Sequence, residues 1–193
     1  MQKVPVGRYL LFFTLAAGGC AVDLATKSWI FGLLGMPGTK PAKWLWPEIF
    51  GLETWLNEGA LFGMGQGQTT LFAGLSVVAA IGVLYWLFIA GAARDRLLTV
   101  ALGMITGGIF GNLYDRLGLH GLRWHSPATG HEVGERVYAV RDWLHFKVDA
   151  WNFDWPIFNI ADSLLVCGGA LLILHALCEA KPQKPSSEAA PES

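Results

Sequence analysis

The chain has 193 residues, of which 53% are hydrophobic and only 15% are charged, and its mean hydropathy is +0.41. A soluble domain usually carries about 25% charged residues, so this composition argues against a soluble protein and indicates a membrane protein with a single domain. The net charge of −1 gives no reason to expect a nucleic-acid partner.

The first long apolar segment covers about residues 9–34, which is enough to cross a bilayer, since a spanning helix needs about 20 residues. Its second half carries Asp23 and Lys27, spaced as an internal ion pair on a helix. The start of the chain also fits a secretory or lipoprotein signal, with small residues before Cys20. Because apolar residues continue past Cys20 to Leu34, we predict an uncleaved spanning helix.

Three further apolar segments complete a predicted all-α membrane protein with four transmembrane helices over residues 1–180. They cover about residues 70–90, 96–117 and 156–177. The remainder, residues 181–193, is polar and rich in proline, so we expect a disordered cytoplasmic tail.

Four spans place both termini on the same side of the membrane. Short basic segments beside spans favour the cytoplasm, and long loops weigh less in this rule. We therefore predict a multi-pass protein of the bacterial cytoplasmic (inner) membrane with both termini in the cytoplasm. The basic residues that support this orientation are Lys3, Arg8, Arg94, Arg96, Lys181 and Lys184.

The two loops on the other side are long and have a pattern of their own. Residues 35–68 contain a run from Ile49 to Phe62 that mixes aromatic, branched and polar residues, which predicts a small strand-rich extracytoplasmic platform. Residues 118–155 end in an aromatic, amphipathic stretch, for which we expect an interfacial helix or loop.

Ionisable and amide side chains gather toward the outer ends of the spans, while the inner halves are almost wholly apolar. A channel or transporter needs polar groups through the full thickness of the membrane, and a non-catalytic scaffold needs none, so we keep both only as alternatives. The asymmetry favours chemistry on a membrane-embedded substrate near the extracytoplasmic face. The polar residues are Asp23, Lys27, Asn57, Asn112, Asp115, Arg116, Asp142, Asn159 and Asp162.

Two carboxyl groups held close together can hydrolyse a peptide bond without a metal, because one keeps its proton while the other ionises. No serine or cysteine has a matching base at a familiar spacing. The five histidines form no HExxH motif, and the three cysteines fit no metal site. We therefore expect no metal and no cofactor.

Five short motifs, in this order, resemble those of the bacterial lipoprotein signal peptidases, or signal peptidase II. They are "DLATK" (23–27), "NEGALFG" (57–63), "GGIFGNLYDR" (107–116), "VRDW" (140–143) and "FNIADS" (158–163). The resemblance implies a membrane aspartic endopeptidase. Its substrates would be prolipoproteins with a diacylglyceryl-cysteine, cut on the amino side of that cysteine, in contact with membrane lipid. It also implies inhibition by globomycin.

The resemblance also implies a role for each matching residue. Asp142 and Asp162 match the catalytic aspartates. Matching positions for side chains that line the site are Asn57, Asn112, Arg116 and Asn159. We expect Asp23, Lys27 and Asp115 to give support and charge balance.

The sequence departs from the family pattern between Arg116 and Asp142, where residues 117–136 have the character of an insertion. Because of this spacing, Asp115 remains a rival to Asp142 as the partner of Asp162. An alternative role for Asp142 is a surface pair with Arg141. Asp149 and Asp154 are further candidates for the partner acid.

Overall fold

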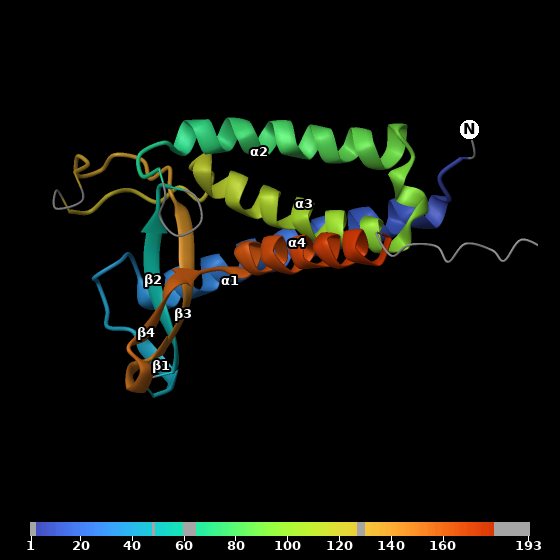
Figure 1. Cartoon of the computed structure of the whole chain (residues 1–193). Helices are drawn as coiled ribbons and strands as arrows, with labels where there is room; N and C mark the ends of the chain where they lie inside the picture. Colours follow the sequence, from blue (N-terminus) through green and yellow to red (C-terminus); the bar gives the residue numbers. More distant parts are fainter. Residues whose placement is uncertain (1–2, 48, 60–64, 127–129, 180–193) are drawn as a thin grey trace, which may run out of the picture.

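The computed structural model describes residues 3–47, 49–59, 65–126 and 130–179, and it contains four helices long and apolar enough to cross a membrane. This confirms the predicted four-span, multi-pass architecture (Figure 1). The helices are α1 (Val6–Leu34), α2 (Thr69–Leu84), which a π-helical turn continues to Ile89, α3 (Arg96–Arg116) and α4 (Ile160–Glu179). Residues 181–193, where a disordered tail was predicted, lie outside the described part.

An antiparallel sheet lies at one end of the helix bundle, where α1 ends and α4 begins (Figure 1). Its strands follow the order β1 (Lys43–Trp46), β2 (Phe50–Asn57), β3 (Val140–Val148) and β4 (Phe153–Phe158). The predicted strand-rich platform is therefore confirmed.

The sheet is larger than the sequence suggested, because the stretch expected as an interfacial helix or loop supplies two of its strands. β3 and β4 are joined by one turn of 3-10 helix, Asp149–Trp151. Their aromatic and branched side chains suit a half-buried pleated surface as well as a membrane interface. α4 begins at Ile160 and not near residue 156 as predicted, because Pro156 still belongs to β4.

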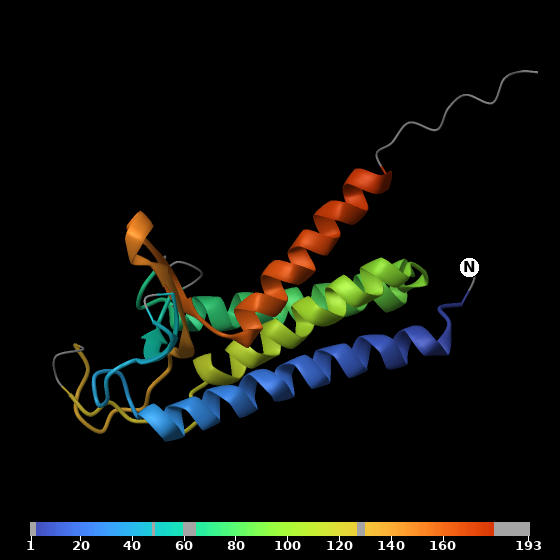
Figure 2. The ribbon, with the colours of Figure 1, turned by 90° about the horizontal axis from the view of Figure 1, so that it is seen from below.

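Glycines on α3 allow this helix to pack closely against both α1 and α4. A Cβ atom on Gly107 would lie 3.0 Å from the carbonyl oxygen of Ala16 in α1. A Cβ atom on Gly108 would lie 2.5 Å from the carbonyl oxygen of Ala161 in α4. α3 therefore packs between the two helices near the sheet, while α4 leans away from α1 toward its own far end (Figure 2).

The sheet is fastened to the bundle by a hydrophobic core at the end of α1. Side chains from α1, β2 and β3 meet there with residues of the segment before β3. This core fixes the position of the sheet relative to the spans. Its buried members are Ile30, Phe31, Leu34, Leu52, Leu56, Trp124, Val137, Ala139 and Trp143.

Candidate active site

The motif "FNIADS" forms the N-terminal cap of α4, and Asn159 occupies the capping position. The backbone N–H of Asp162 donates to Asn159 Oδ1 at 2.9 Å, and the backbone N–H of Asn159 donates to Asp162 Oδ2 at 3.2 Å. This reciprocal pair is a capping box. The backbone N–H of Ala161, also in the first turn of α4, donates to Asp23 Oδ1 at 2.8 Å. The cap therefore fixes the orientation of the Asp162 carboxylate.

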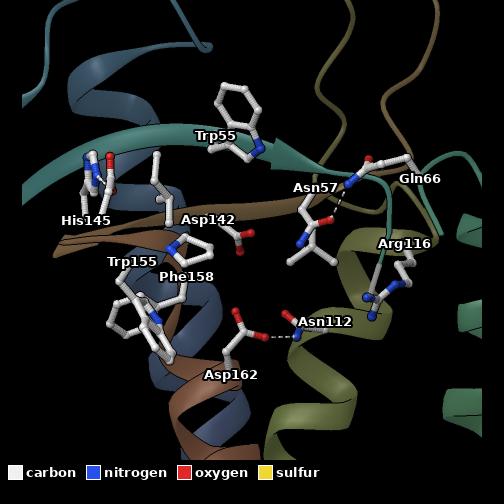
Figure 3. A pocket seen from close by; sticks show the side chains of 14 residues that line it. Trp55, Asn57, Gln66, Asn112, Arg116, Asp142, His145, Trp155, Phe158 and Asp162 are labelled. Atoms are coloured by element: carbon white, nitrogen blue, oxygen red, sulfur yellow. Dashed lines mark hydrogen bonds and ion pairs between the residues drawn. The ribbon is translucent and has the colours of Figure 1, made fainter. Parts of the chain in front are cut away.

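The second acid, Asp142, projects from β3 and is only 1% exposed. Asn159 Nδ2 donates to Asp142 Oδ1 at 2.6 Å, and the Asn57 side chain also hydrogen-bonds to this carboxyl group. Asn159 thus contacts both acids. Figure 3 shows the carboxyl groups of Asp142 and Asp162 directed toward each other across a cavity.

The cavity has a volume of about 470 Å³ and opens between the sheet and the ends of α3 and α4. Five of the residues predicted for the site line it, namely Asn57, Asn112, Arg116, Asp142 and Asp162. The sixth, Asn159, is fully buried beneath the two acids.

The cavity also has lining residues that the sequence analysis missed, and most of them lie on the sheet. Strict alternation along β3 would put Asp142 and His145 on opposite faces. Register shifts between β2, β3 and β4 interrupt that alternation, so no simple sequence pattern could have found His145. The missed lining residues include Trp55, Gln66, His145 and Trp155. Asp154, which the sequence offered as a candidate partner acid, also lines the cavity, and its Oδ1 lies 2.8 Å from His145 Nε2.

Asn112 on α3 links Asp162 to the buried charges. Its Nδ2 donates to Asp162 Oδ1 at 2.9 Å, while its Oδ1 accepts from Lys27 Nζ at 2.9 Å and from Asn159 Nδ2 at 3.2 Å. One turn further, Arg116 donates from Nη2 to the carbonyl oxygen of Gly59 at 3.0 Å. Asn112 and Arg116 are four residues apart on α3, so both side chains lie on the helix face that lines the cavity beside Asp162.

Asp23, Lys27 and Asp115 lie behind the cavity as a buried ion network. Lys27 Nζ is 2.7 Å from Asp23 Oδ2 and 3.2 Å from Asp115 Oδ2, and all three side chains are fully buried. Arg141 completes the network, with its Nη2 2.8 Å from Asp115 Oδ1. The surface pairing considered for Asp142 and Arg141 is therefore wrong, because Arg141 is only 3% exposed and bonds to Asp115.

Burial raises the pKa of the Asp142 carboxyl well above its usual range, and the negative charge of Asp162 raises it further. Lys27 and the hydrogen bonds from Asn159 and Asn57 oppose this rise. The net direction favours a protonated Asp142. Asp162 is less deeply buried, accepts a hydrogen bond from Asn112, and lies in the first turn of α4, where the helix dipole stabilises a negative charge. The two acids therefore have different environments, as acid and base catalysis requires.

Four spans beneath a sheet, with two carboxyl groups facing each other where they meet, define a membrane protein equipped for acid and base chemistry beside the bilayer surface. The family model described as "Signal peptidase (SPase) II" matches residues 15–178. The chain belongs to this family of aspartic membrane peptidases, which cleave signal peptides from prolipoproteins.

Individual relatives agree with the family match. The chain is 48% identical over 173 residues to a lipoprotein signal peptidase of Rhodopirellula baltica, covering 89% of this chain and 74% of the relative. It is 33% identical to one from Rhodococcus jostii, covering 94% and 79% respectively. Among solved structures, a bacterial membrane enzyme determined by the in meso method at 2.3 Å resolution superposes with a TM-score of 0.74 and 25% identity, covering 97% of this chain and 98% of that one.

Proposed function

We propose that Asp142 and Asp162 are the catalytic pair of this lipoprotein signal peptidase, with Asp142 as the acid and Asp162 as the base. The observation that carries the proposal is the position of the two carboxyl groups across the cavity, with Asn159 bonded to Asp142 and capping the helix that carries Asp162. Asn57, Asn112 and Arg116 complete the lining around them.

In the proposed reaction, protonated Asp142 donates a hydrogen bond to the carbonyl oxygen of the scissile peptide. Asp162 takes a proton from water, the water oxygen attacks the carbonyl carbon, and Asp142 transfers its proton to the carbonyl oxygen. As the tetrahedral intermediate collapses, the carbon–nitrogen bond breaks. Asp162 passes its proton to the departing amine, and Asp142 recovers its proton from the intermediate.

Asp115 is a poor alternative to Asp142, because its two oxygens are already occupied. Oδ1 accepts from the Arg141 guanidinium, and Oδ2 accepts from the Arg141 backbone N–H and lies 3.2 Å from Lys27 Nζ. A carboxylate held by two cations and absent from the lining of the cavity has no access to a substrate. We assign it to support, with Asp23 and Lys27.

A second cavity of about 320 Å³ supports a place for the lipid-bearing part of the substrate. It shares Asn112, Arg116 and Asp162 with the first cavity. Its other lining residues are Ser76, Ile109, Leu165 and Val166, from α2, α3 and α4. We propose that this mostly apolar groove receives the apolar signal segment or the diacylglyceryl group from the surrounding membrane lipid, and that globomycin-type inhibitors compete for the two cavities.

We further propose that the protein lies in the bacterial inner membrane with both termini in the cytoplasm and the active site near the extracytoplasmic face. Arg94 and Arg96 lie in the short connection at the bundle end away from the sheet, which fits the preference of such segments for the cytoplasm. Single-cysteine variants at Ala92 and Glu132, in a background without native cysteines, test the orientation. A thiol reagent that cannot cross the membrane should label only the variant at Glu132.

The function is tested with purified protein in detergent and a prolipoprotein that carries a diacylglyceryl-cysteine. Wild type should release the signal peptide. Asp142→Asn and Asp162→Asn should each lower kcat by about 10²-fold or more, since each removes a proton-transfer group. Asp149→Asn is the matched control, because this exposed acid on the β3–β4 turn pairs only with Lys147 in the described structure.

The control variant should cleave like wild type. A wild-type protein that never cleaves this substrate would refute the proposed function. Full activity in Asp142→Asn would instead refute the choice of acids while leaving the peptidase activity intact.

A further inference from the structure

Residues 117–136, which the sequence marks as a possible insertion, are folded onto the rest of the protein where the structure describes them, at 117–126 and 130–136. Backbone bonds join the two arms: Trp124 N–H donates to Glu135 O at 2.9 Å, and Gly134 N–H donates to Trp124 O at 2.8 Å. The Trp124 side chain is only 7% exposed and belongs to the hydrophobic core at the end of α1. The segment is thus anchored in the same hydrophobic core that fixes the sheet.

His131 connects this segment to the end of β2. Its ring stacks on Trp124, with 4.4 Å between ring centroids and 3° between the planes. Its Nε2 lies 2.8 Å from Glu58 Oε1, and its Nδ1 lies 3.3 Å from Glu135 Oε2. A neutral imidazole has a single N–H, so only the imidazolium can donate to both carboxylates.

Glu58 stands between two residues that hold the cavity in shape. Before it, Asn57 hydrogen-bonds to Asp142 and accepts the backbone N–H of Gly59 at 2.9 Å. After it, the carbonyl oxygen of Gly59 accepts from Arg116 Nη2 at 3.0 Å. A shift of Glu58 would therefore move both the Asn57 contact and the Arg116 contact.

We propose that His131 is a positioning residue for the peptidase reaction, which acts by binding Glu58 and so holds Asn57 against Asp142 and Gly59 against Arg116. The inference rests on the proposed function, since it assumes that Asp142 and its neighbours carry the chemistry. It also gives residues 117–136 a role, as a brace between the core at the end of α1 and the rim of the active site. The charged groups that face the imidazole are Glu58 and Glu135.

His131→Phe is the sharpest variant, because it keeps a flat ring on Trp124 but removes both donors. Its matched control is His125→Phe, the same change at an exposed histidine of the same segment. Glu58→Gln removes the acceptor charge from the other side. Each variant is checked for folding by its melting temperature in detergent, and kcat and KM are then measured with the diacylglyceryl prolipoprotein.

We expect kcat to fall about tenfold in His131→Phe, as a small misplacement of catalytic groups would cause, with KM nearly unchanged. Combining His131→Phe with Glu58→Gln should cost little more than either alone, since both break the same contact. His125→Phe should behave like wild type.

A purely stabilising role would lower the melting temperature of His131→Phe and leave its kcat unchanged, which would overturn the proposal. Fully additive losses in the double variant would overturn it as well. If His131→Phe does not fold, Glu58→Gln alone decides, and wild-type kcat in that variant refutes the proposal. None of these results bears on the proposed function, which fails only if wild type does not cleave.

Discussion

Asp115 holds Arg141 by three hydrogen bonds, one of which comes from the backbone. Its Oδ2 accepts the backbone N–H at 3.0 Å, and its Oδ1 accepts Nε at 3.0 Å and Nη2 at 2.8 Å. Because Arg141 directly precedes Asp142, a carboxylate on α3 fixes the strand position from which the proposed catalytic acid projects. The same contact makes Arg141 part of a buried network of two anions and two cations.

The charge balance of this network gives a first prediction. In Arg141→Leu, Lys27 is the one cation left in the network to balance Asp23 and Asp115. One buried negative charge is then uncompensated. We expect a loss of about 3–5 kcal/mol in the free energy of unfolding. Adding Asp115→Asn restores neutrality, with the Lys27–Asp23 pair still intact.

Thermal unfolding in detergent provides the measurement for this pair of variants. The double variant should be more stable than Arg141→Leu alone, although it has lost one further native group. A double variant that is less stable than Arg141→Leu would contradict the view that buried charge balance dominates at this position.

The raised pKa of Asp142 gives a second prediction, for stability against pH. The folded state holds the Asp142 proton more tightly than the unfolded chain, where an aspartate carboxyl has a pKa of about 3.9. The stabilising contribution is therefore complete below the unfolded pKa and is lost as pH rises through the raised folded pKa. Asp142→Asn is always neutral, so its melting temperature should fall less between weakly acidic and alkaline pH than that of wild type.

Activity should also depend on whether Asp142 carries its proton. As pH rises through the raised pKa of Asp142, kcat/KM should fall, because the acid that polarises the scissile carbonyl is lost. The measurement is a pH–rate profile of wild type with the lipidated substrate. An alkaline limb absent up to the limit of protein stability would count against Asp142 as the acid.

The sequence predicted the spans well, because each is an apolar run long enough for a bilayer, and it predicted the polar residues that gather near the sheet. It could not predict that Arg141 would bond to Asp115, since the two are 26 positions apart in the chain and only tertiary packing brings them together. It also predicted a helix or loop where β3 and β4 form, because aromatic amphipathic sequence suits a strand as well as an interfacial segment. The rivalry between Asp115 and Asp142 could be weighed only once their different partners were visible.

Close packing of α3 on α4 gives a third prediction. A Cβ atom on Gly108 would lie 2.5 Å from the carbonyl oxygen of Ala161 and 2.9 Å from Leu165 Cγ, so Gly108→Ala must push α4 away. We expect a loss of about 1–3 kcal/mol from overpacking, and lower kcat because Asp162 moves with α4. Gly169→Ala is the control, since a Cβ atom there meets nothing within 4 Å. Equal stability and activity in both variants would rule out this packing constraint.

Asn159 gives the last prediction, because it combines a structural and a catalytic contact in one side chain. Its Oδ1 caps α4 through the N–H of Asp162, while its Nδ2 donates to Asp142. Asn159→Asp keeps the capping oxygen but replaces the donor with a carboxylate beside Asp142. Asn159→Ala loses both functions and should also cost about 1 kcal/mol of stability through the lost cap.

The two Asn159 variants separate these roles when melting temperature and kcat are measured together. Both should lower kcat strongly, since neither alanine nor an ionised aspartate can donate to Asp142. In Asn159→Asp, the new carboxylate adds a third acid to the pair and should shift the pH–rate profile, because like charges in one site favour the protonated form. Ser163→Ala is the control on the same helix turn, since its hydroxyl contacts only the Asn159 carbonyl oxygen among the described residues. Wild-type kcat in Asn159→Ala, which has no side-chain donor, would show that the hydrogen bond from Asn159 to Asp142 has no part in catalysis.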